Sequence, residues 1–366
     1  MDISIIIVSW NVRELLKKCL ESVFAQTKEN TPINGVSSDD SAKGSNPTRQ
    51  SKNSIADSKN LSSAARVDGT GLEPASPRLT SRVAYQLAEP PTRVASDIIS
   101  QFEIIVVDNA SSDGTVEMVS SFAKATDDKA KIRVIANDKN LGFAAANNQG
   151  IKEAKGEYIL LLNPDTEFIE NSLEKIIAKM QSDEKIGVLG CKLLNSDKTI
   201  QPSVRRFPTV WSQLVILFKL HKIFPFLLNS YLAKDFDHPP APSLVKEGES
   251  TFSPPPVPRR GLGGGSEVDQ VMGAFFCVRK SLFDKIGLLD EGYFIWFEEV
   301  DFCRRAKQAG YKVVYWPGTS VVHHAGQSFA QQMTLKKQLW FFKSAWRYFR
   351  KNVKVQNPNV KSRPND

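Results

Sequence analysis

The stretch FEIIVVDN, residues 102–109, carries the pattern that decides the fold: a short run of apolar, mostly β-branched residues that ends in an acid. Such a run between turn signals is typical of a strand that is buried on both faces of a sheet. Similar runs occur at ISIIIVSW (3–10), IRVIAND (132–138) and EYILLLNPD (157–165). The sequence therefore predicts four buried strands.

An amphipathic helical pattern follows each of these strands. The four patterns are VRELLKKCLESVFAQ (12–26), SSDGTVEMVSSFA (111–123), GFAAANNQGIKEAKG (142–156) and ENSLEKIIAKMQ (170–181). Strands that alternate with helices favour an α/β fold, with a mostly parallel sheet and helices on both faces. Ligands of such sheets bind at the carboxyl ends of the strands, where Asp108 and Asp165 end two of the predicted ones. We therefore expect a nucleotide site there.

Two long segments interrupt this alternation. Residues 28–97 are rich in Ser, Asn, Asp, Thr and Pro and show neither a helical nor a strand period, while residues 238–266 gather prolines and then glycines. Compositions of this kind predict disordered insertions outside the folded core. We therefore expect one folded domain over residues 1–332, interrupted by these two insertions, and a separate tail over 333–366.

Composition and charge limit the class of protein. The chain has 366 residues, 41% of them hydrophobic and 24% charged, which is typical of a globular protein. Its four cysteines are far apart, so they predict reduced thiols of a cytoplasmic protein and no disulfide framework or zinc site. No stretch approaches the ~18 uncharged apolar residues that a membrane span needs. From Met333 onward, nine Lys or Arg face one acid, which equals the whole formal charge of +8. The near-neutral remainder argues against binding to nucleic acid.

Three acids lie within four positions in FIWFEEVDFCRRAKQAGY, residues 294–311: Glu298, Glu299 and Asp301. One interpretation is an amphipathic helix whose first turn carries acids because they are favoured by the helix dipole. Another is that crowded carboxylates with apolar neighbours have a raised proton affinity, as a general base requires. The segment by itself supports both.

Six motifs in order resemble glycosyltransferase family 2, and most closely its rhamnosyltransferase-like branch. They are SIIIVSWN, EIIVVDNASSDGT, NLGFAAANNQG, YILLLNPDT, FEEVDFCRRAKQAGY and VVHHAGQS, and the resemblance continues through QPSVRRFPT. It covers nearly all of the chain outside the two insertions. The resemblance implies a GT-A fold, a nucleotide-diphosphate-sugar donor, a divalent metal and inversion at the anomeric carbon.

The resemblance also implies roles for individual residues. Asp108 would bind the base or ribose of the donor, and Asp165 would be the last acid of the metal-binding D-x-D motif, in which Asn163 replaces the first Asp. His323 would be a second ligand of Mn²⁺ or Mg²⁺. The other residues expected around the donor nucleotide are Val8, Ser9, Asn11, Asn109, Asn140, Gly142 and Asn147. Turn formation at Asn-Pro-Asp, a structural histidine and ordinary packing of an Ala-rich helix are the simpler alternatives.

Glu299 matches the family's general base, with Glu298 and Asp301 as rivals. It would remove a proton from an acceptor hydroxyl, whose oxygen attacks the anomeric carbon. A nucleotidyltransferase would also use a sheet, a nucleotide and a metal, but VSWNVRELL after the first strand has no glycine for a phosphate loop. A non-catalytic carbohydrate-binding relative would lose the acids, which are all present. Rhamnose is one candidate for the transferred sugar.

The tail carries an apolar stripe beside a basic one. Leu335, Leu339, Phe342, Trp346 and Phe349 recur at helical spacing, next to Lys336, Lys343, Arg347 and Arg350. Such a helix either packs its aromatic side on the core or lies in the headgroup region of an anionic membrane. Relatives of this branch commonly build cell-surface glycans on lipid-linked acceptors at the cytoplasmic face. We therefore predict peripheral attachment to the inner face of the cell membrane.

Overall fold

The computed structural model describes residues 2–26, 102–125, 130–234, 236, 264–324 and 334–356. The predicted insertion at 28–97 lies outside these residues, and so does 238–263 of the second one. Residue Ser266, which we had placed at the end of the second insertion, already begins the short strand β9 (Ser266–Glu267). In the described part of the chain, no helix is apolar and long enough to cross a membrane.

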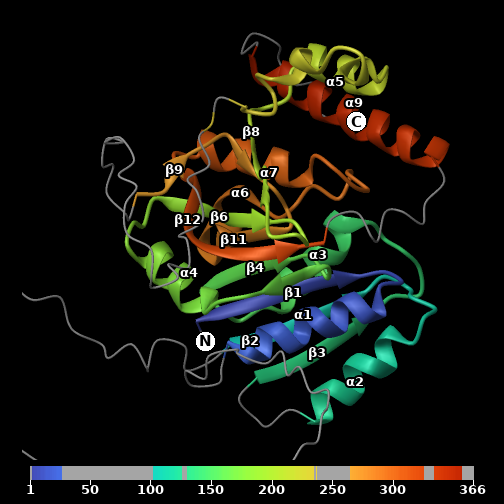
Figure 1. Ribbon diagram of the computed structural model, residues 1–366, viewed down its shortest axis with the longest axis vertical. Helices are drawn as coiled ribbons and strands as arrows, with labels where there is room; N and C mark the ends of the chain where they lie inside the picture. The colour runs from blue at the N-terminus through green and yellow to red at the C-terminus, as the bar shows by residue number, and fades with distance from the viewer. Residues whose placement is uncertain are drawn as a thin grey trace, which may run out of the picture. The chain divides into compact units, whose positions relative to one another are not determined.

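The centre of the molecule is a ten-stranded mixed sheet (Figure 1). Four parallel neighbours form one half of it: β3 (Ala130–Ala136), β2 (Phe102–Asp108), β1 (Ile3–Ser9) and β4 (Tyr158–Leu162). The other half continues with β11 (Phe275–Arg279), β6 (Ile186–Leu194), β12 (Lys312–His323) and β5 (Thr166–Phe168), with β7 (Ile200–Gln201) beside β6 and β9 beside β12. β11 enters antiparallel between β4 and β6, whereas β6 and β12 are parallel. The predicted α/β class and the four strands are confirmed.

Helices cover both faces of the sheet. Successive side chains of β1 point to opposite faces, and the apolar side chains on each face are buried by helices. Ile3, Ile5 and Ile7 belong to a core shared with α1 (Arg13–Ala25), α2 (Thr115–Ala125) and α4 (Ser172–Gln181). Ile6 belongs to the opposite core, with α3 (Phe143–Glu153), α6 (Lys280–Ile286) and α7 (Glu298–Gln308). A Cβ at Gly150 of α3 would lie 2.6 Å from Ile6, so this glycine lets the helix approach the sheet closely.

A smaller layer lies beyond α7. In it, β8 (Val204–Arg205) pairs with β10 (Gln270–Val271), and α5 (Val210–Leu217) leads into the 3₁₀ turns η2 (Leu220–Lys222) and η3 (Pro225–Leu228). The last helix, α9 (Thr334–Gln356), contacts α5 and lies beside it in Figure 1.

One side of α9 packs on the core. Tyr348 is fully buried, and its hydroxyl accepts a hydrogen bond from Arg304 Nη1 at 2.9 Å. Lys351 forms an ion pair with Asp301 at 2.8 Å. The other side of the helix is exposed and carries four of the five residues of the predicted apolar stripe: Leu335, Leu339, Phe342 and Trp346. The packed side agrees with the first interpretation, and membrane attachment through the exposed side stays a prediction.

Candidate active site

A cavity of about 580 Å³ opens at the carboxyl ends of β1 and β4. Its lining includes six of the nine residues expected around a donor nucleotide, namely Val8, Ser9, Asn109, Asn140, Gly142 and Asn163. The parallel register places Ser9 beside Asp108, so the ends of β1 and β2 meet at this edge. The site lies where an open α/β sheet binds its ligands.

Asp108 and Asn109 form the loop after β2. The Ser111 backbone N–H donates to Asp108 Oδ2 at 2.9 Å, while Oδ1 is buried and has no hydrogen-bond partner among the described residues. Asn109 Nδ2 donates to the Gly142 carbonyl at 3.2 Å, which ties this loop to the start of α3. Asp108 itself is buried and is not part of the cavity lining, so its predicted contact with the donor stays a prediction that rests on this unsatisfied oxygen.

Asn11 and Asn147 do not line the cavity. Asn11 has a left-handed backbone (φ 53°), and its Oδ1 accepts from the Ser112 N–H at 2.8 Å, so it braces the loop after β1. Asn147 is buried in α3 and donates to the Phe143 carbonyl at 2.9 Å. Their positions fit local structural roles.

Asp165 and His323 meet at the wall of the cavity. His323 Nε2 lies 3.4 Å from Asp165 Oδ1, and both side chains are buried. On its other side, His323 Nδ1 lies 2.8 Å from Gln201 Oε1, and a contact of this kind orients the ring of a metal-binding histidine. Asn163 Nδ2 completes the group, 3.4 Å from His323 Nε2. One carboxylate and one imidazole fit a divalent cation that takes its other ligands from phosphates and water. Within the described ranges, no third acid, His or Cys joins them.

A strained turn presents the acids of α7. Trp296 and Phe297, just before the helix, have φ angles of 63° and 74°, a region that costs a non-glycine residue about 1–2 kcal/mol. The rings of both residues contact Phe341 of α9. Ser344 Oγ of the same helix donates to the Ile295 carbonyl at 2.9 Å. The packed side of α9 therefore holds this turn in place.

Glu298 and Glu299 both line the cavity, and each has a buried Oε2 with no hydrogen-bond partner among the described residues. Burial raises the pKa of Glu298 well above its ordinary value, and the charge of Glu299 raises it further. Burial also raises the pKa of Glu299, against the opposing effect of the Arg205 guanidinium. Burial therefore favours the protonated form of both carboxyl groups, and a raised proton affinity is a property that a general base needs.

Asp301, the third predicted candidate, is not part of the lining. Its carboxylate forms ion pairs with Arg305 and Lys351, both at 2.8 Å. Arg305 also donates to the Leu288 carbonyl at 2.8 Å. These contacts make Asp301 an anchor between α7 and α9.

Several lining residues were not identified from the sequence. Two of them, Lys337 and Trp340, come from α9, and the Trp340 ring stacks on Phe294 with centroids 4.5 Å apart. Arg205 also lines the cavity and belongs to the motif QPSVRRFPT, to which we assigned no role. The density of aromatic residues in the tail was the available signal for Trp340.

Comparisons with known proteins show what this chain is similar to. The family model for glycosyl transferase family 2 matches residues 87–236. An N-acetylglucosaminyl-diphospho-decaprenol L-rhamnosyltransferase of Mycobacterium tuberculosis is 25% identical over 62% of this chain and 67% of its own length. The rhamnosyltransferase WbbL of Escherichia coli is 24% identical over 70% of this chain and 86% of its own.

The fold agrees with these matches. A crystal structure of GalNAc-T7 with UDP, GalNAc and Mn²⁺ superimposes with a TM-score of 0.53 at 16% identity, covering 100% of this chain and 53% of that one. The shared architecture is the GT-A fold. The chain is a glycosyltransferase, and it is similar to proteins of glycosyltransferase family 2 that include rhamnosyltransferases.

Proposed function

We propose that this enzyme transfers a sugar, with inversion, from a nucleotide-diphosphate-sugar to an acceptor hydroxyl, and that Glu299 is the general base. The position of Glu299 carries this proposal, because its side chain lines both the cavity at the strand ends and a second one behind it. Glu298 lines the first cavity alone. A base at this junction reaches a donor on one side and an acceptor on the other.

The proposed reaction has one substitution step. Glu299 takes the proton of the acceptor hydroxyl, and the oxygen forms a bond to the anomeric carbon from the face opposite the diphosphate. The bond between the anomeric carbon and the diphosphate oxygen breaks, and its electron pair leaves with the nucleoside diphosphate. Arg205 and Lys337 both line the two cavities, and Lys337 would face the leaving group.

The donor would occupy the cavity at the strand ends. Asp108 and Asn109 would contact the nucleoside, with Val8, Ser9, Asn140, Gly142 and Asn163 around it. Asp165 and His323 would hold Mn²⁺ or Mg²⁺, whose charge stabilises the leaving diphosphate. The structure of GalNAc-T7 with UDP and Mn²⁺ supports a donor of this class.

Names of relatives and the surface of α9 support the expected partners. The mycobacterial relative is named for a diphospho-decaprenol acceptor and for rhamnose, which favours rhamnose as the sugar and a glycan or lipid-linked glycan as the acceptor in cell-surface polysaccharide synthesis. The exposed apolar stripe of α9, with its basic neighbours, supports peripheral attachment at the cytoplasmic face of the membrane.

Removal of the metal tests this function. With a panel of nucleotide sugars, transfer or slow donor hydrolysis should vanish with a chelator and return with Mn²⁺ or Mg²⁺. Asp165→Asn should lose activity by about 10²-fold or more at an unchanged melting temperature, whereas Asp284→Asn, an exposed control on α6, should keep it. Full activity of Asp165→Asn would refute the metal assignment. Release of pyrophosphate from a nucleoside triphosphate and a sugar phosphate would instead indicate a nucleotidyltransferase, and donor binding without turnover a non-catalytic protein.

A further inference from the structure

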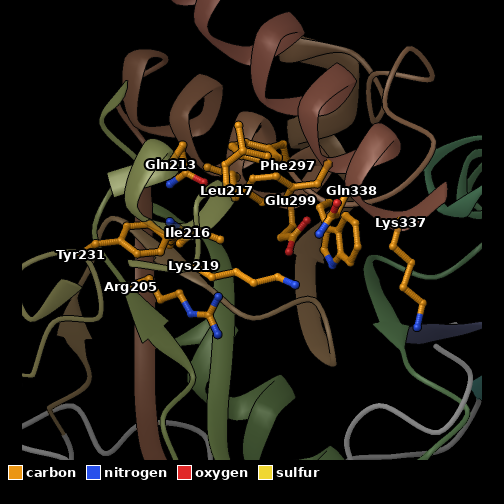
Figure 2. A pocket seen from close by; sticks show the side chains of 14 residues that line it. Arg205, Gln213, Ile216, Leu217, Lys219, Tyr231, Phe297, Glu299, Lys337 and Gln338 are labelled. Carbon is orange, nitrogen blue, oxygen red and sulfur yellow. The ribbon is translucent and has the colours of Figure 1, made fainter. Parts of the chain in front are cut away.

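A second cavity, of about 360 Å³, lies behind Glu299 between α5 and α9 (Figure 2). It shares Arg205, Trp296, Glu299 and Lys337 with the donor cavity, so the two are continuous past the proposed base. An acceptor hydroxyl that meets Glu299 from the side opposite the donor therefore belongs to a molecule in this second cavity.

The charge of this cavity is positive. Arg205, Lys219 and Lys337 line it, and Glu299 is the one acid among its described lining residues. In Figure 2, Arg205 and Lys219 lie on one side of Glu299, and Lys337 lies on the other. Lys219 is placed by a left-handed turn (φ 55°) between α5 and η2, a conformation that is unfavourable for a lysine. Three cations around one opening favour an anionic ligand.

The wall of the cavity also contains an unsatisfied polar group. Gln213 of α5 is 5% exposed, and its Oε1 has no hydrogen-bond partner among the described residues. Its Nε2 donates to Ser212 Oγ at 2.9 Å. A buried amide oxygen without a partner costs stability, and a hydroxyl of a bound molecule would satisfy it.

The remaining walls of the cavity are apolar, and its two helices also expose apolar side chains. Ile216 and Leu217 of α5 face Phe341 of α9 across the cavity lining. Outside it, large apolar side chains are exposed: Trp211 and Leu214 on α5, Phe218 directly after α5, and Leu335, Leu339, Phe342 and Trp346 on α9. A long hydrocarbon chain that left the cavity would meet this surface.

We propose that the cavity between α5 and α9 binds the phosphate or diphosphate of a lipid-linked acceptor, with Lys219 and Arg205 as its ligands. The acceptor's sugar extends toward Glu299, and its hydrocarbon chain leaves over the exposed faces of α5 and α9. This inference rests on the proposed function, because it takes Glu299 as the base. It adds the place where the acceptor's phosphate binds and the residues that bind it.

Binding of farnesyl diphosphate to the full chain tests the proposal. Farnesyl diphosphate is titrated into the protein in the presence of a chelator, and binding is measured by calorimetry. Lys219→Gln should bind it roughly tenfold or more weakly than the unchanged protein, because the charged hydrogen bonds from Lys219 to the phosphate are lost. Lys219 is exposed and lines only this cavity, so the variant should fold and keep the donor site. Lys222→Gln, the same change three residues further on, is the matched control and should bind as the unchanged protein does.

The comparison ligands separate the sources of phosphate. Farnesol and inorganic pyrophosphate should each bind much more weakly than farnesyl diphosphate, and phosphatidylglycerol vesicles should not displace it. Three results would overturn the proposal. The first is that both lysine variants bind farnesyl diphosphate equally well. The others are that inorganic pyrophosphate binds as tightly as farnesyl diphosphate, or that the vesicles displace farnesyl diphosphate. A thermal shift with Mn²⁺ and a nucleoside diphosphate is read in parallel on the same proteins. If Mn²⁺ and the nucleoside diphosphate do not shift the melting temperature of the unchanged protein, the result counts against the proposed function, whether or not farnesyl diphosphate binds.

Discussion

At the scale of single residues, the site depends on two adjacent glutamates that are buried without a hydrogen-bond partner for one oxygen each among the described residues. This burial destabilises the folded state when the two groups are charged, because burial disfavours the charged form of a carboxyl group. Asp301, two residues further on, avoids that cost through its ion pairs with Arg305 and Lys351. Neighbouring acids thus have different roles according to their surroundings.

Substitution of Glu298 should reveal this cost. Because the folded-state pKa of Glu298 is raised above its ordinary value of 4.5, its contribution to stability is present below that value and is lost as pH rises through the folded pKa. Glu298→Gln is neutral at every pH, so it should melt about 2 °C or more above the unchanged protein at pH 8, and nearly equal to it at pH 4.

Calorimetric melting at the two pH values measures the effect. Glu14→Gln, at a glutamate whose side chain is 77% exposed, is the control and should leave both melting temperatures unchanged. A Glu298→Gln protein that melts lower than the unchanged one at pH 8 would show that this carboxylate stabilises the fold.

At the scale of elements, α9 has two sides with different roles. Its packed side supports the strained turn before α7 and supplies Lys337 and Trp340 to the donor cavity. Its other side exposes Phe342 by 51% and Trp346 by 64%. Removal of the whole tail would therefore disturb both the site and any membrane contact, so point substitutions on the exposed side are the cleaner test.

Phe342→Gln with Trp346→Gln should weaken sedimentation with anionic liposomes at low salt, because these side chains supply apolar area to the interface. High salt should release the unchanged protein as it screens the basic residues. Transfer to a soluble acceptor should stay unchanged in the double variant. Ile169→Gln, at a 42% exposed apolar residue near α4, is the control and should sediment normally. Equal sedimentation of all three proteins would contradict membrane attachment through this side.

Elements that form from a local sequence pattern could be predicted, whereas elements fixed by contacts between distant residues could not. Four strands and four helices up to residue 181 were predicted because each is a continuous local pattern of apolar residues, whereas the three-residue strand β5 in that range was not predicted. β11 was not, because its antiparallel place between β4 and β6 is fixed by pairing with distant residues. The same reason explains the site: Asp108, Asp165 and their neighbours follow strand ends and were found, whereas Lys337 and Trp340 reach the cavity only through the packing of α9.

At the scale of the whole molecule, the described residues form one α/β unit whose strand ends supply the donor side of the site and whose layer of α5, α7 and α9 supplies the other side (Figure 1). Residues 28–97 lie outside this description. Their composition offers little apolar surface to bury.

Deletion of residues 32–96 should therefore leave the melting temperature and the transfer rate nearly unchanged, because a shorter loop costs little to close. Melting by calorimetry and initial transfer rates on the shortened chain test this expectation. A fall of many degrees would show that the segment packs on the rest of the chain.

The central claim is that Glu299 accepts the proton of the acceptor, and the transfer rate of Glu299→Gln tests it most directly. The substitution keeps the size of the side chain and removes the proton acceptor, so kcat should fall by ~10²-fold or more, while nucleotide binding in Mn²⁺, measured by calorimetry, stays unchanged. Glu298→Gln and Asp301→Asn, assayed beside it, should lose less. A Glu299→Gln enzyme that transfers sugar at the unchanged rate, with Glu298→Gln or Asp301→Asn inactive instead, would contradict the account.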